Sequence, residues 1–422
     1  MRKSLTYKIL LSVLALTAIN YALPANTTAG KVNDDYYVDY DGETVSGNFD
    51  FDNVYGNGHS FTITGGKIIN VYGVGNGNYD KDASGGNVTI NGNANVSYLV
   101  YGGRSDKGEA YNNTVNISGD NSSVRGVYGG MSSSGNAHHN TVNISGGTVE
   151  VCVYGGMSDS VAFSTSAGEV HHNTVNISGG TVDYVFGGIS RSSGNAHHNT
   201  VNINGDAEVT GDVCGSYSEN SNAYDNTVNI SGGIIGEADD IVNIYGGYID
   251  HSGIAYDNEV VISGSADITY ANLYGYGGDP TNATGNTLTI DGWSGSTESV
   301  QNFNDIAFKN IDWNENEPVL RIRIGGLKNT KIDTIHIAGG SNINVGDKMT
   351  LIESRNGNDL SLTKDNVTDT FTAGVAREGL GSTSVDGNGN VTFNVNSIKL
   401  SSQAVSAAQT RAASAAFVNQ GT

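Results

Sequence analysis

The chain has 422 residues, of which 59 are glycine and 3 are proline, and its 43 acidic and 21 basic side chains give a formal net charge of −22. A surface this acidic is repelled by nucleic acid and by anionic membrane surfaces, so neither is expected as a partner. Hydrophobic residues make up 37% of the chain, enough to fill a narrow core. Their regular placement argues against a disordered chain.

Residues 1–25 have the pattern of a secretory signal peptide. Basic residues at the start of the chain precede the apolar run Ile9 to Ile19, and small residues follow it. The run is too short to span a membrane, so we expect this segment to direct export. Cleavage is compatible with three positions, after Ala22, Ala25 or Ala29. The mature protein is therefore expected to be exported.

Residues 26–58 form an irregular start to the pattern that follows. Apolar and polar residues already alternate, as in Phe49-Asp50-Phe51, and Val54-Tyr55-Gly56 has the form of later segments. The end of a stacked structure must hide an open edge, so terminal repeats are atypical. This segment is expected to be an N-terminal cap.

An internal repeat occupies residues 59–292, and its clearest copy is Asn140 to Gly156, NTVNISGGTVEVCVYGG. The copies follow one another at steps of 26 to 33 residues, a period typical of solenoids, propellers or arrays. The first apolar residues of the aligned copies are Phe61, Val88, Val115, Val142, Val175, Val201, Val228, Val260 and Leu288.

The spacing within one copy predicts short strands. Val142 and Ile144 alternate with polar residues, which is the period of a β-strand, and glycine pairs supply the turns. Propeller blades need about 40 residues, and dense glycine disfavours helices. Stacking the coils covers the apolar face that one coil leaves open. We predict an all-β fold, a right-handed parallel β-helix (solenoid) with coils of about 27 residues.

Stacking would turn two sequence positions into columns. Aromatic residues in one column are expected to hold the coils in register by ring stacking; a carbohydrate-stacking strip is the alternative, because the alternation does not tell whether the rings face inward. Asparagines in the other are expected to form a structural hydrogen-bonded ladder. The first column is Tyr55, Tyr72, Tyr101, Tyr128, Tyr154, Phe186, Cys214, Tyr245 and Tyr274, and the second is Asn113, Asn140, Asn173, Asn199, Asn226, Asn258 and Asn286.

Three histidine pairs precede the asparagine column, at His138-His139, His171-His172 and His197-His198. Stacked imidazoles are able to share Zn²⁺ or Ni²⁺. However, Tyr224-Asp225 takes the same two positions in the next coil, which favours a polar surface ladder. We therefore predict no metal-binding and no cofactor-binding residues.

Catalytic residues are not expected either. A β-helix enzyme acting on polysaccharide needs carboxylates that converge across neighbouring coils. The acidic residues of the later coils stand at different points of the repeat and form no such set. They are Asp206, Asp212, Asp225, Asp239, Asp240 and Asp257.

Cys152 and Cys214 are a candidate disulfide, since the chain is expected to be exported. In the alignment they stand two coils apart, about 9.6 Å along the rod at roughly 4.8 Å per coil. A disulfide needs Cα atoms within roughly 7 Å of each other. We therefore predict two unpaired thiols.

The repeat stops after Trp293. Strand-like segments separated by Asn, Asp and Gly turns continue through residues 293–399, which indicates a C-terminal β cap. From Ser401 the sequence is rich in alanine and begins with serines suited to a helix N-cap. Residues 400–422 are therefore expected to contain a helix of about 18 residues.

The chain contains, in order, a signal peptide, glycine-rich repeats, a cap with VGDKMTLI (Val345 to Ile352) and a helix with RAASAAFVNQG (Arg411 to Gly421). This order resembles the passenger region of autotransporters. These are the type V secretion proteins of Gram-negative bacteria. The resemblance implies that the cap acts as an autochaperone and that the helix leads to an outer-membrane translocator barrel. Since the sequence stops at Thr422, we expect a fragment, or a barrel supplied elsewhere.

The resemblance implies a non-enzymatic, surface-displayed or secreted adhesin or structural rod, located at the cell surface, in the outer membrane or outside the cell. Its partner is expected to be a host surface, a glycan or another copy of the rod. A β-helix carbohydrate-active enzyme, a polysaccharide lyase or hydrolase, is the alternative, and an inert stalk is a third.

Overall fold

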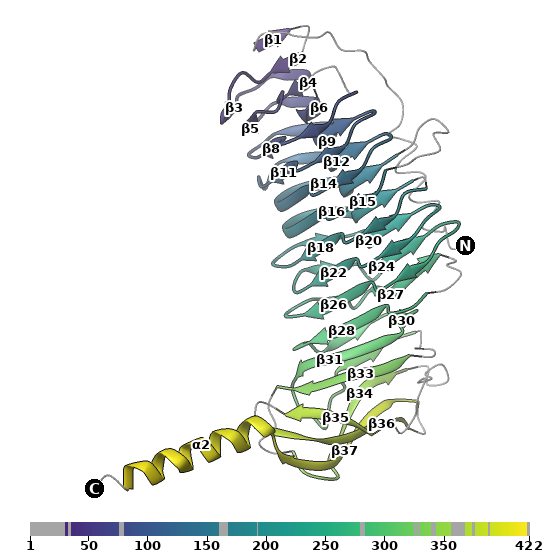
Figure 1. Ribbon diagram of the computed structural model, residues 1–422. Helices are drawn as coiled ribbons and strands as arrows, with labels where there is room; N and C mark the ends of the chain where they lie inside the picture. The colour runs from purple at the N-terminus through teal and green to yellow at the C-terminus, as the bar shows by residue number, and fades with distance from the viewer. Residues whose placement is uncertain are drawn as a thin grey trace.

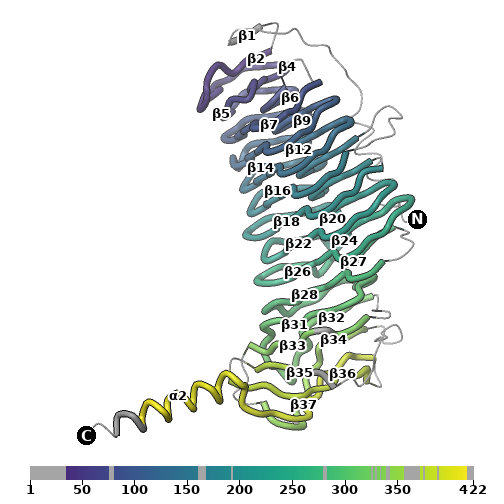
Figure 2. Tube along the Cα trace, in the orientation of Figure 1, coloured from purple at the N-terminus to yellow at the C-terminus, as the bar shows by residue number. Residues whose placement is uncertain are grey.

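The computed structural model describes residues 30–32, 35–75, 80–159, 168–191, 193–278, 283–324, 327, 330–338, 343–355, 368–373, 376–386 and 389–419. The expected signal peptide, residues 1–25, lies outside them. The described chain is a parallel β-helix, an elongated rod in which each coil stacks on the one before (Figures 1 and 2).

One stack of parallel strands contains the T-V-N-I segments of the repeat. The alternation places one side of each strand in the core, as the pattern of buried and half-buried residues in Thr114–Ile117 shows. The strands are β3 (Glu43–Val45), β5 (Ser60–Ile63), β8 (Asn87–Ile90), β11 (Thr114–Ile117), the first part of β14 (Thr141–Ser158) and of β16 (Thr174–Ser190), β18 (Thr200–Ile203), β22 (Thr227–Ile230), β26 (Glu259–Ser263), β28 (Thr287–Asp291), β31 (Asp305–Ile311), β33 (Lys331–Ile337) and β35 (Thr368–Ala373).

A second stack contains the valine and tyrosine segments that follow the first turn of each coil. It joins the first stack through the long strands β14 and β16. Its other strands are β2 (Asp35–Tyr37), β4 (Asp50–Tyr55), β6 (Lys67–Val74), β9 (Asn95–Ser105), β12 (Ser123–Ser132), β19 (Glu208–Val209), β20 (Val213–Ser218), β23 (Ile234–Ile235), β24 (Val242–Ile249), β27 (Ala271–Gly278) and β30 (Ser299–Gln301).

A third stack is a separate seven-stranded sheet of two-residue strands, each of which places one small or apolar residue inward. It consists of β7 (Ala83–Ser84), β10 (Ala110–Tyr111), β13 (Ala137–His138), β15 (Val170–His171), β17 (Ala196–His197), β21 (Ala223–Tyr224) and β25 (Ala255–Tyr256).

The register matches the repeat alignment in the apolar and the aromatic columns, although β-bulges interrupt the pairing between them. Val115 pairs with Val142, and the same pairing runs from Phe61 to Leu288. The aromatic positions likewise pair in sequence from Tyr55 to Tyr274. Insertions in the turns therefore change the length of a coil without shifting its strands.

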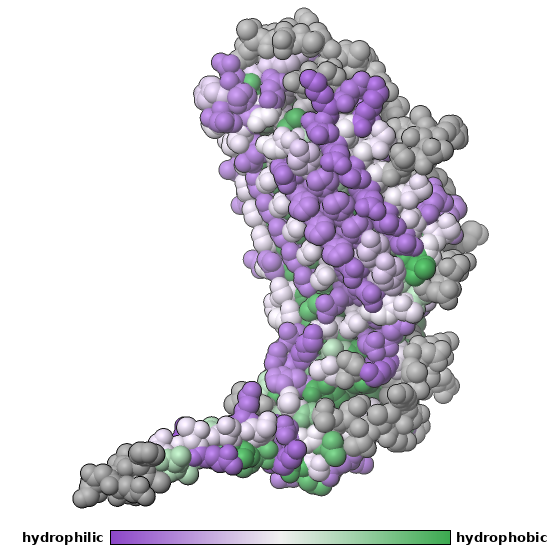
Figure 3. Space-filling model, viewed as in Figure 1, coloured by the Kyte–Doolittle hydropathy of each residue, from purple (hydrophilic) through white to green (hydrophobic). Residues whose placement is uncertain are grey.

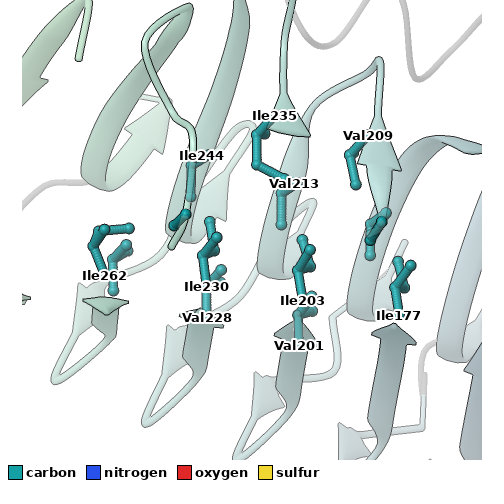
Figure 4. Close-up of a cluster of buried hydrophobic side chains, with 14 of the residues drawn as sticks. Ile177, Val201, Ile203, Val209, Val213, Val228, Ile230, Ile235, Ile244 and Ile262 are labelled. Atoms are coloured by element: carbon teal, nitrogen blue, oxygen red, sulfur yellow. The ribbon is translucent and has the colours of Figure 1, made fainter. Parts of the chain in front are cut away.

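A continuous apolar core runs inside the stacks, built from columns of valine and isoleucine. Ile177, Ile203, Ile230 and Ile262 form one such column, and all four are at most 1% exposed (Figure 4). Burying a side chain of this size stabilises the folded state by about 1.5–3 kcal/mol. The narrow rod is thus held together by short, repeated β-branched contacts.

A glycine doublet bends the second stack. Tyr245 and Tyr248 are three residues apart on β24, yet their rings meet edge to face with centroids 5.2 Å apart. Residues three apart on a straight strand point to opposite faces, so the strand must fold at the doublet between them. In β14 the doublet is Gly155-Gly156, where a Cβ on Gly155 would lie 2.4 Å from the carbonyl oxygen of Gly187. Only glycine permits this close approach.

Parallel coils continue beyond the end of the sequence repeat. β28 pairs with β31, and β29 (Gly295–Thr297) pairs with β32 (Leu320–Ile322), which pairs with β34 (Lys348–Ser354). Antiparallel pairing appears at the two ends of the described rod, where β1 (Gly30–Val32) pairs with β2, and β36 (Arg377–Val385) and β37 (Val391–Leu400) pair with each other. These antiparallel strands cover the terminal coils.

The expected C-terminal helix is α2 (Ser402–Asn419), which extends away from the last coils (Figure 1). The Ser401 hydroxyl accepts a hydrogen bond from the backbone N–H of Ala404 at 3.1 Å, as an N-cap does. Among the described residues, no helix has the length and apolar character needed to cross a membrane.

Candidate functional site

The aromatic column is buried except at its last ring, Tyr274, which is half-buried. Val153 belongs to the main core, whereas its neighbour Tyr154 belongs to a second buried cluster on the opposite face of the strand, in the angle of the glycine bend. Tyr154 is 0% exposed and Phe186 is 1% exposed. A carbohydrate strip needs exposed ring faces, so these rings act as packing. Tyr37 extends the column by one coil at the N-terminal end, since it pairs with Tyr55.

The asparagine column is also buried and forms a continuous ladder. The Asn140 side-chain Nδ2 donates to the Ala110 carbonyl at 2.9 Å and to Asn173 Oδ1 at 2.9 Å. The backbone N–H of Asn140 also donates to Asn173 Oδ1, at 3.1 Å. Each amide thus satisfies backbone groups where the chain turns a corner, which is the structural role expected from the sequence.

A second amide ladder lies on the outer face of the first stack. Asn143 Nδ2 donates to Asn116 Oδ1 at 2.9 Å, and Asn176 Nδ2 donates to Asn143 Oδ1 at 2.8 Å. The ladder continues through Asn202 and Asn229, and all of these residues are half-buried. The rod therefore presents a regular polar surface.

The six histidines form two parallel columns. The ring centroids of His138 and His171 are 4.9 Å apart with an interplanar angle of 2°, and those of His139 and His172 are 5.0 Å apart at 2°. Within a pair, the Nδ1 atoms of His138 and His139 are 2.8 Å apart. One Nδ1 donates and the other accepts, so each pair holds one shared proton when neutral.

Backbone geometry explains the choice of residue in the second of these columns. His139 has a φ of 55°, which is in the left-handed region, and the equivalent residues have nearly the same angle. Besides glycine, asparagine, aspartate and histidine are the residues that adopt this region most readily. The positions are Asn112, His139, His172, His198, Asp225 and Asp257.

The histidine columns have the geometry of ring stacks. Burial, together with the neighbouring imidazoles His138, His197 and His172, lowers the pKa of His171 to about 4. At neutral pH its ring is uncharged and stacks between its neighbours. No group of three or more histidine, cysteine or acidic side chains in the described part of the chain has a geometry that could hold a metal ion.

Both cysteines are buried and unpaired, as the sequence predicts. Burial raises the pKa of the Cys152 thiol to about 12. Burial also raises the pKa of Cys214, whose Sγ lies 2.8 Å from the Ser216 carbonyl oxygen. A buried, protonated thiol is a weak nucleophile, so neither residue is a candidate catalytic group.

The candidate carboxylates do not converge, but the expectation that all of them stand at different points of the repeat is wrong for Asp225 and Asp257, which share one column. Asp212 is 1% exposed and accepts hydrogen bonds from Asn243, whereas Asp225 and Asp257 continue the left-handed column below His198. Asp206, Asp239 and Asp240 are exposed in the turns before β19 and after β23.

A hollow of about 280 Å³ lies among the last parallel coils and was not predicted from the sequence. Three arginines line it, Arg321, Arg323 and Arg355. The sequence does not group these arginines, because Arg321 and Arg323 alternate with apolar residues, as on any surface strand, and Arg355 follows more than 30 residues later. No repeat connects them.

Comparison of this chain with family models, with curated proteins and with solved structures gave no match.

Proposed function

We propose that this chain is an exported, non-enzymatic rod of the autotransporter-passenger kind that presents a binding surface outside the cell. Its expected location is the cell surface or the medium, in association with an outer-membrane translocator barrel. Its binding partner would be a host surface, a glycan or another copy of the rod.

The proposal rests on the hydrogen bonds within both amide ladders, which occupy the amide groups of their asparagines. Inner and outer asparagines bond to their own copies from coil to coil, so the side chains that define the rod are committed to its structure. The outcome is a long, regular polar face, and Figure 3 displays a largely hydrophilic surface along the middle of the rod. Such a scaffold suits presentation of a surface better than turnover of a substrate.

Export is tested by expressing the whole chain in a Gram-negative host and fractionating the cells. We expect the rod outside the inner membrane, and we expect the same chain without residues 1–25 to stay in the cytoplasm. Cytoplasmic retention of the whole chain would contradict the proposal.

Binding is tested with the exported rod on immobilised glycans, on host-cell surfaces and on a second preparation of itself. We expect retention on at least one of these surfaces without chemical change. Release of reducing ends or of unsaturated sugars from a polysaccharide would instead identify an enzyme.

A further inference from the structure

Arginine is concentrated at one place on this acidic rod. Three of the nine arginines in the chain line the hollow among the last parallel coils, together with Thr269, Ser296 and Glu353. Arginine presents a planar set of donors that matches carboxylate and sulfate groups. On a chain with a net charge of −22, a cluster of three basic side chains is unexpected.

Two of the three arginines already have acidic neighbours. Arg321 Nε donates to Glu353 Oε2 at 3.0 Å, and a second nitrogen of Arg321 contacts Glu317. Arg323 lies 3.1 Å from Glu298 Oε2, and that glutamate side chain is 5% exposed. These contacts fix the two guanidinium groups and leave some of their N–H donors for other partners.

Arg355 is placed beside Arg323 on the neighbouring coil. Ile322 pairs with Ser354 in register, and the Arg355 N–H donates to the Ile322 carbonyl at 3.2 Å, so the next residues along the two strands are Arg323 and Arg355. Arg355 is exposed and has no ion pair with any residue that the structure describes. Like charges side by side on paired strands destabilise a sheet unless a counter-charge lies between them.

The rest of the hollow fits a small organic acid. Ile322 lines the hollow through its backbone, because its side chain is 0% exposed and belongs to the main core, and the Arg323 guanidinium lies over the Tyr270 ring with its Cζ 5.2 Å from the centroid. Ser296 and Thr269 add hydroxyl groups at the rim. The volume is near the lower end of the range for small-molecule sites, which suits a single sugar ring.

We propose that this hollow binds an acidic sugar through its carboxylate or sulfate group, held between Arg323 and Arg355. The sugar ring lies over the backbone of β32 at Ile322, and the hydroxyls of Ser296 and Thr269 face its polar edge. The site lies outside the ladders on which the proposed function rests. Binding of an acidic sugar can therefore be tested independently of adhesion.

The test is calorimetric titration of the whole chain with glucuronate, with glucose 6-sulfate and with neutral glucose, at low ionic strength. We expect heat from one or both acids and none from glucose, and we expect the affinity to fall as salt is added. The two acids distinguish a carboxylate site from a sulfate site. Equal binding of glucose, or no binding of either acid, would overturn the proposal.

Two variants with opposite expected effects separate binding from folding. Arg355→Gln removes a charged hydrogen-bond donor and should weaken acid binding about 10- to 100-fold. Glu353→Gln removes a competing carboxylate from Arg321 and should tighten binding several-fold. Arg125→Gln changes the net charge equally but lies on β12, and it should leave binding unchanged. Weaker binding in Glu353→Gln, or unchanged binding in a folded Arg355→Gln, would overturn the assignment.

Discussion

The repeated coils, residues 59–292, and the C-terminal coils, residues 293–399, share parallel stacking but differ in what fills each column. In the repeated coils, the inner corner holds asparagine in every coil from Asn113 to Asn286. In the C-terminal coils, one outward column reads Ser296, Arg321, Glu353. The first region repeats a residue, whereas the second changes residue and charge at each step.

This difference separates stability from recognition. An amide donates and accepts at once, so a column of identical amides satisfies itself and needs no ligand. A guanidinium group such as that of Arg321 only donates, so it requires a carboxylate from the chain or from a ligand. The regular region is therefore suited to hold the rod together, and the irregular region has room for a specific site.

The largest expected effect is on the inner ladder. Asn173→Ala removes donors to Ala137 and Asn199 and acceptors for the backbone and side chain of Asn140. Buried groups on both adjoining coils are left without partners, so we expect the free energy of unfolding to fall by about 3–5 kcal/mol. Urea titration of the whole chain measures it. A loss below about 1 kcal/mol would mean that water replaces the amide.

The next effect is at the glycine bend. Gly155→Ala places a Cβ against the Gly187 carbonyl and 3.2 Å from a Val175 methyl group. Overpacking of this kind costs about 1–3 kcal/mol, and neighbouring coils would have to separate to relieve it. Thermal unfolding compared with Ser145→Ala, an exposed residue of the same strand, measures the difference. Equal melting temperatures would contradict the need for glycine here.

Much of the regular region follows from the sequence, because identical residues mark the register. The pairing of Val115 with Val142, the continuity of the aromatic column, the unpaired thiols and the C-terminal helix were all predicted and are confirmed. The parallel coils after Trp293 were harder to predict from the sequence. Their strands pair through alternating burial, and no repeated residue marks the register.

Three features could not be predicted from period-two alternation. Alternation assigns faces only to a straight strand, and the doublet at Gly155 bends the strand so that Tyr154 is buried on the side away from the main core. The alternation does not predict the left-handed backbone at His139 either, although the exchange of Asn, His and Asp at that position indicates a left-handed residue. The arginine hollow joins residues from separate coils and has no periodic signature.

A moderate, pH-dependent effect is expected at the histidine columns. The pKa of His171 is lowered from 6.5 to about 4, so the unfolded chain binds a proton that the folded chain does not between these values. Stability is therefore complete above about pH 6.5 and decreases as the pH falls towards 4. Because the ring is only half-buried, we expect a loss of about 1 kcal/mol from this residue.

The matched variant is His171→Tyr, because tyrosine occupies this position at Tyr111 and Tyr224. It keeps the ring stack but cannot take up a proton in this range. Urea titrations at pH 7 and pH 4.5 should show a smaller acid-induced loss in the variant. An identical loss in both proteins would assign the acid sensitivity to other groups.

The smallest expected loss of stability is in the outer ladder. It is compared with the loss at Asn173 in the inner ladder. Asn143→Ala breaks the bonds to Asn116 and Asn176, but water reaches this half-buried face and can replace both partners. We expect a loss of about 0.5–1 kcal/mol, several-fold less than at the inner corner. The two substitutions lie in adjacent coils and differ in access to water and in the backbone groups to which Asn173 also bonds. Equal losses at Asn143 and Asn173 would show that the bonds between amides, rather than burial, determine the strength of the ladder.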